Sequence, residues 1–277
     1  MSLNLPARTN AQSTAIDERV FGWDPTPGIV SVWANREGRA VVWRRELSEQ
    51  QGQGRVLCTS EQFRPWLFAA SLDDLSHIGS ALQPTNAPGS ANAPVCYQEL
   101  DGPENSYRYL LSARDGRTLE RMLLTGASRR LNRQITNLND LSDDYYRVGP
   151  VEQYLMSTGK VYFRGMVYDD LHRLQFDLET TALDPHRGRI FLVSLKDNRG
   201  LATTLEAPQP EDEARLIADL CALIRERDPD VIENHNLFGF DLSFLEVRAT
   251  TLGIPLALGR QGGPPLLERR EETLAVG

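Results

Sequence analysis

The amino-acid sequence predicts an α/β protein in two parts: a β-rich first part, then a part in which strands and helices alternate. Short apolar runs separated by turn-forming residues fill the first 150 residues, which is typical of strands. From Leu171 onward, three strand-like segments are followed by a helix, a strand and a second helix. A chain of 277 residues has room for two domains, and we expect them at residues 1–150 and 151–277.

The first part contains four predicted strands, with turn signals such as DPTPG and NREG between them. Helical periodicity predicts a helix over residues 116–135, interrupted at Gly126, and a short helix over 151–159 that ends at a glycine. The segment 82–95 is rich in Pro, Ala, Asn and Gly, so we expect an exposed loop there. The predicted strands are residues 28–34, 40–46, 55–60 and 107–113.

The second part has a more regular pattern. Residues 211–228 form a clear amphipathic helix, with acids in its first turn and Arg225 and Arg227 in its last, as the helix dipole favours. Apolar residues at spacings of three and four, Leu242, Leu245, Ala249 and Leu252, predict a second helix over residues 240–253. The predicted strands are residues 174–183, 189–197, 200–207 and 230–236.

Composition excludes several classes of protein. No apolar run approaches the roughly 18 residues that would span a membrane, and the N-terminal segment lacks the apolar core of a signal peptide. Cys58, Cys96 and Cys221 are scattered, so they form neither a disulfide framework nor a zinc-binding spacing. We therefore expect a reduced, cytoplasmic protein.

The charge distribution leaves one question open. A net charge of −8 argues against a surface that binds nucleic acid everywhere, but a local basic face is compatible with it. Arginines gather in one stretch with only two acids among them, either as a solvated helix face or as a phosphate-contacting patch. They are Arg108, Arg114, Arg117, Arg121, Arg129, Arg130 and Arg133.

Two acids, Asp177 and Glu179, lie inside an apolar segment. In a strand they would point to the same side, about 7 Å apart at their backbones. Carboxylate oxygens suit Mg²⁺ or Mn²⁺, and two such ions are the usual device for attacking a phosphodiester. A pattern of two acids separated by one residue also arises by chance, so a solvent-facing strand end remains the alternative.

A second polar pattern, NHNLFGFDLSFL (234–245), joins a predicted strand to a helix. Asn236 is expected at the end of the strand and Asp241 in the first helical turn, where an acid also serves as a cap. The same position would bring a third carboxylate to a strand–helix junction, where open α/β sheets bind ligands. Phe240 is either a core residue or a contact for a base or sugar. The two patterns together are more specific than either alone.

FDLETTALD followed by NHNLFGFDLSFL resembles the Exo I and Exo II motifs of the 3′–5′ exonuclease domain of family B DNA polymerases. The resemblance implies a ribonuclease H-like fold, a mixed sheet with flanking helices, for residues 151–277. It implies a β-rich α+β N-terminal domain of family B type for residues 1–150. QFRPWLF (62–68) and residues 152–174 resemble that domain and its junction to the exonuclease.

By this resemblance, Asp177, Glu179 and Asp241 are catalytic and bind two Mg²⁺ or Mn²⁺ ions. The fourth acid of the family, in a Tyr-x₃-Asp Exo III motif, has no counterpart, since no aspartate follows Asp241 and no tyrosine follows Tyr168. We therefore expect a fragment of a longer polymerase, with an incomplete metal site and weak or no nuclease activity. Three later glutamates without such a tyrosine are poor substitutes: Glu268, Glu271 and Glu272.

The resemblance also implies DNA as the partner, as a single-stranded 3′ end or a primer–template, with polymerase domains in the parent chain and no membrane. Asn236 and Phe240 would position the frayed 3′ strand. Thr180 and Leu183 would lie near the terminal nucleotide, with Leu183 as a wedge against the base. His235 is expected to point away from the site.

Three functions remain open. The first is the proofreading exonuclease region of a DNA-directed DNA polymerase, which removes mismatched 3′ nucleotides by two-metal hydrolysis. The second is a non-catalytic module that binds single-stranded DNA or template on a degenerate nuclease fold. The third is a free-standing exonuclease acting on short RNA or DNA; the long β-rich first part and the missing acid weigh against it.

Overall fold

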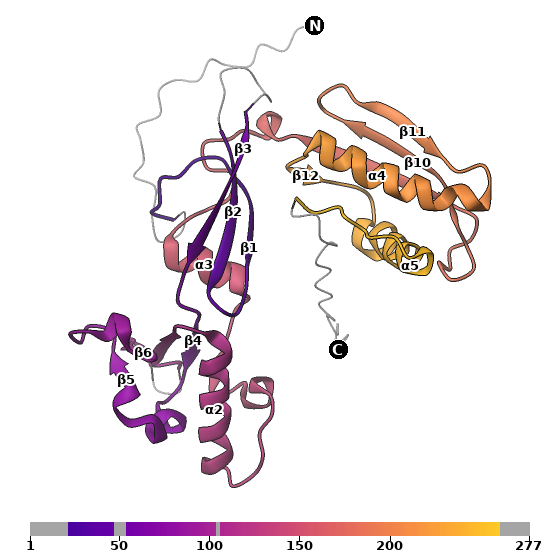
Figure 1. Ribbon diagram of the computed structural model, residues 1–277. Coiled ribbons are helices and arrows are strands. Elements are labelled where there is room, and N and C mark those ends of the chain that lie inside the picture. The colour runs from indigo at the N-terminus through magenta and orange to yellow at the C-terminus, as the bar shows by residue number, and fades with distance from the viewer. Residues whose placement is uncertain (1–21, 47–53, 104–105, 261–277) are drawn as a thin grey trace, which may run out of the picture. The chain divides into compact units, whose positions relative to one another are not determined.

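The computed structural model describes residues 22–46, 54–103 and 106–260, so the expectations for the N-terminal segment and for Glu268, Glu271 and Glu272 lie outside it. The chain divides into two compact units, the first reaching Gly165 and the second beginning at Met166 (Figure 1). Both units combine strands and helices, which confirms the α/β class. The expected domain limit at 150/151 stays a prediction.

A three-stranded antiparallel sheet begins the first unit. Its strands are β1 (Ile29–Ala34), β2 (Arg39–Arg45) and β3 (Val56–Gln62), in that order. Helix α3 (Pro150–Thr158) covers this sheet, because the Tyr154 ring is fully buried among residues of β1 and β2. The predicted strands 28–34, 40–46 and 55–60 and the predicted helix 151–159 all correspond to these elements.

The second sheet of this unit has five strands and packs against helix α2 (Gly116–Arg130). Gly126 does not interrupt α2. It is buried where the helix crosses the backbone of Asp74, and a side chain there would collide with the Asp74 carbonyl oxygen. The strands run in the order β5 (Leu82–Pro84), β6 (Val95–Glu99), β7 (Tyr109–Ala113), β4 (Trp66–Ala69), β8 (Tyr145–Tyr146).

The second unit is built on a four-stranded mixed sheet in the order β11-β10-β9-β12. Antiparallel pairs join β9 (Arg173–Thr180), β10 (Ile190–Asp197) and β11 (Ala202–Glu206), whereas β12 (Val231–Ile232) is parallel to β9. The chain crosses from β11 to β12 through helix α4 (Glu213–Arg227), and α5 (Leu242–Leu252) follows β12. The predicted order of three strands, helix, strand, helix is confirmed.

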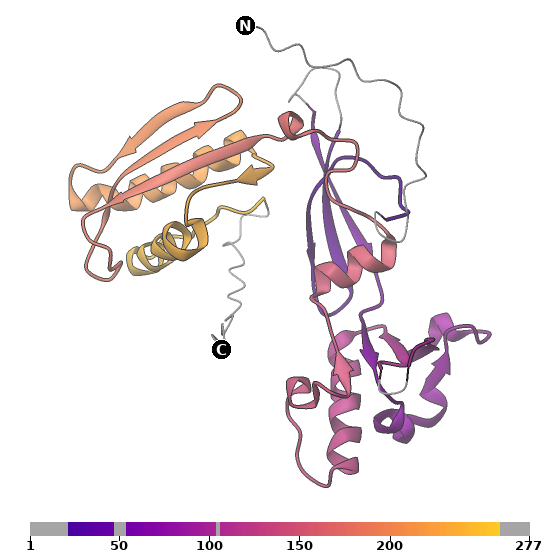
Figure 2. The same cartoon turned by 180° about the vertical axis from the view of Figure 1, so that it is seen from behind.

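Both helices of this unit pack on one face of the sheet. Leu174, Phe176 and Leu178 of β9 are buried in one core with apolar residues of α4 and α5. The alternate residues of β9 are exposed, so the second face carries Asp177 and Glu179. Figure 1 shows α4 lying along β10 and β11, and Figure 2 shows the strands from behind. The apolar–polar alternation of the sequence therefore predicts the two faces of β9 correctly.

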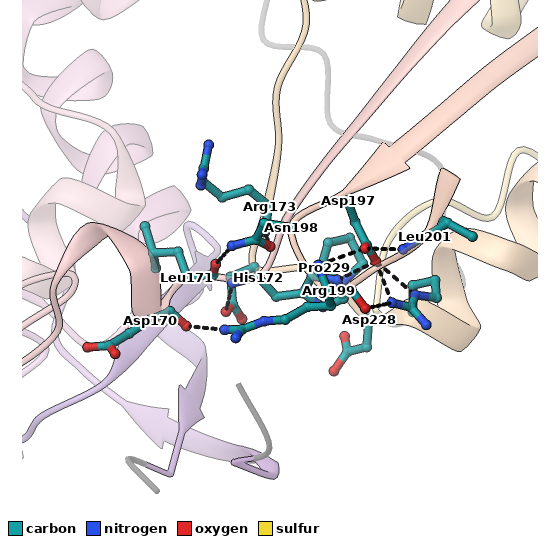
Figure 3. Close-up of polar contacts among 12 residues, drawn as sticks. Asp170, Leu171, His172, Arg173, Asp197, Asn198, Arg199, Leu201, Asp228 and Pro229 are labelled. Atoms are coloured by element: carbon teal, nitrogen blue, oxygen red, sulfur yellow. Dashed lines mark hydrogen bonds and ion pairs between the residues drawn. The ribbon is translucent and has the colours of Figure 1, made fainter. Parts of the chain in front are cut away.

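The start of β9 is held by a buried carboxylate. Asp197 accepts a bond from His172 Nε2 at 2.8 Å and from Arg227 Nε at 2.8 Å. Its other oxygen accepts the backbone N–H groups of Arg199 and Leu201, each at 2.8 Å (Figure 3). This cluster ties the first residues of β9, the β10–β11 turn and the end of α4 together.

The smaller elements differ most from expectation. The predicted strand 230–236 forms only the two residues of β12, because the backbone leaves β9 after Glu233. A π-turn, Leu237–Asp241, precedes α5, so that helix begins later than predicted. The predicted loop 82–95 contains β5 at its start. The remaining short 3₁₀ turns are Asp73–Ala81, Ser90–Asn92, Leu138–Leu141, Tyr168–Asp170 and Pro210–Asp212.

Candidate functional site

Strand β9 places the first two acids of the site. Residues of a strand alternate between its faces, so the burial of Phe176 and Leu178 turns Asp177 and Glu179 outward together. Across the sheet, Asp177 pairs with Ser194 of β10. The two acids therefore lie on the open face of the strand, as the sequence predicts.

The third acid arrives from a different element. Asp241 ends the π-turn and directly precedes α5, and only 2% of it is exposed. Burial raises the pKa of its carboxyl above the ordinary value, and the nearby Asp177 carboxylate raises it further. Hydrogen bonds from the backbone N–H of Leu178 and from Asn234 act in the opposite direction. The fold thus brings Asp177 and Asp241 close enough for their charges to interact.

Asn234 joins these two acids. Its Nδ2 lies 3.0 Å from Asp241 Oδ2 and 3.4 Å from Asp177 Oδ1. The prediction from sequence gives Asn234 no role. Glu233 separates Asn234 from β12, and no local feature of the sequence marks Asn234, because its role depends on which residues of β9 lie beside it.

The donor set fits a cation in part. Two carboxylates held together, one of them buried, form a site that a divalent cation would stabilise, and such oxygens suit Mg²⁺ or Mn²⁺. Glu179 lies on the same face of β9, but the part of the chain that the structure describes contains no group of three or more His, Cys, Asp or Glu residues positioned for a metal. Asp177 and Asp241 are therefore the pair that would hold a cation.

The predicted substrate-contacting residues lie in two loops. Leu183, in the loop after β9, is 84% exposed, and Thr180 Oγ1 donates to the carbonyl of Ala182 in that loop. Asn236, at the start of the π-turn, is exposed and adopts a left-handed backbone conformation with φ of 59°. Phe240 is half-buried and packs against Phe244 of α5, in agreement with the core alternative.

Two further residues lie in the second loop, and the orientation expected for one of them, His235, stays a prediction. Phe238, in the π-turn between Asn236 and Asp241, is 72% exposed and was not predicted. An exposed aromatic ring in the same turn as a buried acid is suited to contact a base. The side chain of His235 is also exposed, and its backbone N–H donates to Asn234 Oδ1.

The arginines of the first unit border an open groove of about 910 Å³ along α2. Arg36, Arg117, Arg121 and Arg129 contribute to its walls together with Glu120. Part of the positive charge is already neutralised, since Arg117 pairs with Glu37 at 2.7 Å and Arg36 with Glu120 at 3.6 Å. A solvated helix face and a phosphate-contacting patch both agree with this arrangement.

Comparison with known proteins finds a family match within the second unit. Residues 188–268 match the family model of the exonuclease domain of DNA polymerase family B. The matched range contains Asn236, Phe240 and Asp241, whereas Asp177 and Glu179 lie before it. A DNA polymerase of Pyrococcus glycovorans is 33% identical over 141 residues, and DNA polymerase 1 of Pyrococcus abyssi has the same identity over the same length.

These alignments cover 47% of the chain and 18% of each relative, so the chain corresponds to a small part of the relatives' length. The structure of the family B DNA polymerase of the hyperthermophilic archaeon Pyrobaculum calidifontis matches with a TM-score of 0.59 at 22% identity. That match covers 85% of the chain and 33% of the solved one, and it agrees with the predicted ribonuclease H-like fold. The matched part of the chain is thus similar to the exonuclease domain of family B DNA polymerases, and the chain spans about a fifth of the length of the relatives it matches.

Proposed function

We propose that the chain is the N-terminal and exonuclease region of a family B DNA-directed DNA polymerase and that its second unit hydrolyses the 3′ end of single-stranded DNA. In the parent enzyme, this activity removes mismatched nucleotides, because a mismatched end frays at lower free energy than a paired one. Residues 1–150 are then the N-terminal domain and residues 151–277 the exonuclease domain.

One observation carries this proposal. Asp177 and Asp241 are 64 positions apart in the sequence, yet both contact the same amide nitrogen of Asn234. The two polar patterns thus meet at the junction of strand and helix, where their chemistry requires them to meet.

The residues divide the proposed chemistry between them. Asp177 and Asp241 would hold Mg²⁺ or Mn²⁺, and Glu179 lies on the same face of β9 as Asp177. When bound, such ions lower the pKa of an attacking water and stabilise the leaving 3′ oxygen. Burial disfavours the charged form of Asp241 on its own, and a bound cation would offset this cost because water screens their attraction weakly there. Leu183 and Phe238 present exposed apolar surface for the terminal bases.

A nuclease assay tests the proposal. The chain, in excess over a 5′-labelled single-stranded oligodeoxynucleotide, is incubated with Mn²⁺, with Mg²⁺ or with EDTA. We expect slow shortening from the 3′ end, only with metal, because the acid set of the described residues is small. Asp177→Asn and Asp241→Asn should abolish it. Asp184→Asn, in an exposed turn after β9, is the matched control and should retain it.

Shortening that continues unchanged in Asp177→Asn would contradict the proposal, because the cleavage would then come from another site. Complete inertness with protein in excess would also contradict catalysis by this chain.

Inertness would favour a second function, a non-catalytic module that binds single-stranded DNA or template. This alternative needs no complete metal site, and the described residues bring together only the pair Asp177 and Asp241 through Asn234. Fluorescence anisotropy with a labelled oligonucleotide would then show binding that survives Asp177→Asn and weakens with salt.

A further inference from the structure

The segment after β12 aligns its side chains with successive residues on the open face of β9. Glu233 Oε1 accepts a hydrogen bond from Arg173 Nη1 at 2.9 Å and from Gln175 Nε2 at 3.2 Å. Asn234, the next residue, reaches the next position of that face, Asp177. The segment that follows β12 therefore supplies a partner for each of three successive positions on the open face of β9.

The orientation of the Asn234 carboxamide is fixed by its own loop. Its Oδ1 accepts the backbone N–H of His235 at 2.8 Å, so Nδ2 is the end that faces the acids. A carboxamide nitrogen has two hydrogens and can donate one to each of two acceptors. Asp177 and Asp241 offer one oxygen each, at 3.4 and 3.0 Å from that nitrogen.

The two acids differ in how firmly the fold holds them. Asp241 is 2% exposed and is fixed by burial and by backbone hydrogen bonds, whereas Asp177 stands on the exposed face of a strand. Two carboxylates repel each other, so an unrestrained Asp177 side chain would turn toward solvent. The described contact that holds Asp177 toward Asp241 is the one to Asn234.

We propose that Asn234 is a positioning residue of the cation site, which keeps the Asp177 carboxylate turned toward Asp241 so that a divalent cation meets both. The inference rests on the proposed function, because it concerns the same two acids. Asn234 itself acts through these acids and touches neither cation nor substrate. Side chains that orient metal ligands in this way change metal affinity by about 10- to 100-fold when they are removed.

A Mn²⁺ titration of the intact chain without DNA tests the proposal, with free Mn²⁺ followed by electron paramagnetic resonance. Asn234→Leu has nearly the same shape and no donor, and we expect it to weaken Mn²⁺ binding by about 10- to 100-fold. Asn234→Ser restores one hydroxyl donor and should recover part of the affinity. Gln175→Leu is the matched control, because it removes a carboxamide that donates to the neighbouring Glu233, and it should bind Mn²⁺ as the unmodified chain does.

Each outcome has a definite meaning. Wild-type affinity in Asn234→Leu would overturn the inference and leave the proposed function intact, and tighter binding would show that the amide competes with the cation. If the unmodified chain binds no Mn²⁺, or binds it as well as Asp177→Asn does, there is no cation site at these acids. Both proposals would then be overturned. Thermal unfolding by circular dichroism checks the fold of each variant, and Asn234→Ala replaces Asn234→Leu if the larger side chain prevents folding.

Discussion

Removing the charge of Asp197 is expected to destabilise the second unit in a way that depends on pH. The carboxylate side chain is 0% exposed and receives the side chains of His172 and Arg227 together with the backbone N–H groups of Arg199 and Leu201. Asp197→Asn keeps the shape of the side chain but replaces one carboxylate oxygen by an NH₂ group. That group is a donor, and it would face the N–H groups that now donate to Asp197. Fewer of these hydrogen bonds can form, and the Arg227 guanidinium loses its buried counter-charge.

The pKa of this carboxyl gives the magnitude. Burial alone would raise the pKa, but the hydrogen bonds from His172, Leu201 and Arg227 outweigh it and bring the pKa from the ordinary 3.8 to about 2. A difference of this size between folded and unfolded states is equivalent to about 2 kcal/mol of stability. Since the folded-state pKa is the lower one, this stability is fully present above the unfolded value of 3.8 and is lost as the pH falls toward 2.

Urea denaturation followed by circular dichroism, repeated between pH 7 and pH 2.5, measures this effect. We expect Asp197→Asn to be less stable than the unmodified chain by about 2 kcal/mol at neutral pH, with the difference shrinking below pH 4. Asp219→Asn is the control, since Asp219 forms an exposed ion pair with Arg215 on α4, and it should change stability by less than about 0.5 kcal/mol. A difference for Asp197→Asn that stays constant down to pH 2.5 would refute the reasoning.

Three further predictions concern other parts of the molecule. Gly126→Ala should destabilise the first unit by about 1–3 kcal/mol in a thermal melt, because the new methyl group collides with the backbone of Asp74; unchanged stability would mean that the turn Asp73–Ala81 can move. Arg248→Met should reduce stability by about 3–5 kcal/mol in urea denaturation, since it leaves buried Glu213 without its cation; a smaller loss would show that Glu213 becomes protonated. Leu183→Ala should leave the melting temperature unchanged because the side chain is 84% exposed, yet it should slow the cleavage of single-stranded DNA; an unchanged cleavage rate would remove Leu183 from the site.

The elements that the sequence predicts well are those whose burial pattern is regular. β9 alternates strictly between apolar and polar residues, and α4 carries an apolar stripe through Leu216, Leu220 and Ile224, all of them buried. Such patterns follow from one face of an element packing against a single core. The outward position of Asp177 follows from the same regularity, whereas Asp241 lies at the end of a π-turn that the helical pattern does not predict.

Elements that depend on tertiary contacts were missed. β8 has only Tyr145 and Tyr146, and it exists because these residues pair with β4. Gly126 reads as a helix breaker from propensity, whereas its actual role is to let two backbones approach closely. Asn234 carries no local signal of its function, since its importance depends on which residues of β9 lie beside it.

The contacts that stabilise the start of β9 also affect the candidate site further along the same strand. At the start of β9, the Arg173 backbone N–H donates to Asn198 Oδ1 at 2.9 Å, and the adjacent His172 is hydrogen-bonded to Asp197. These two contacts fix where the strand begins against β10. A shift of one residue in this register would turn Asp177 to the core face and Phe176 to solvent, since side chains alternate with a period of two. The hydrogen bonds at the start of the strand therefore support the register in which the burial of Phe176 and Leu178 turns the acids outward. Asn234 then only has to orient a carboxylate that the register has already placed, which is why a single amide is sufficient for that task.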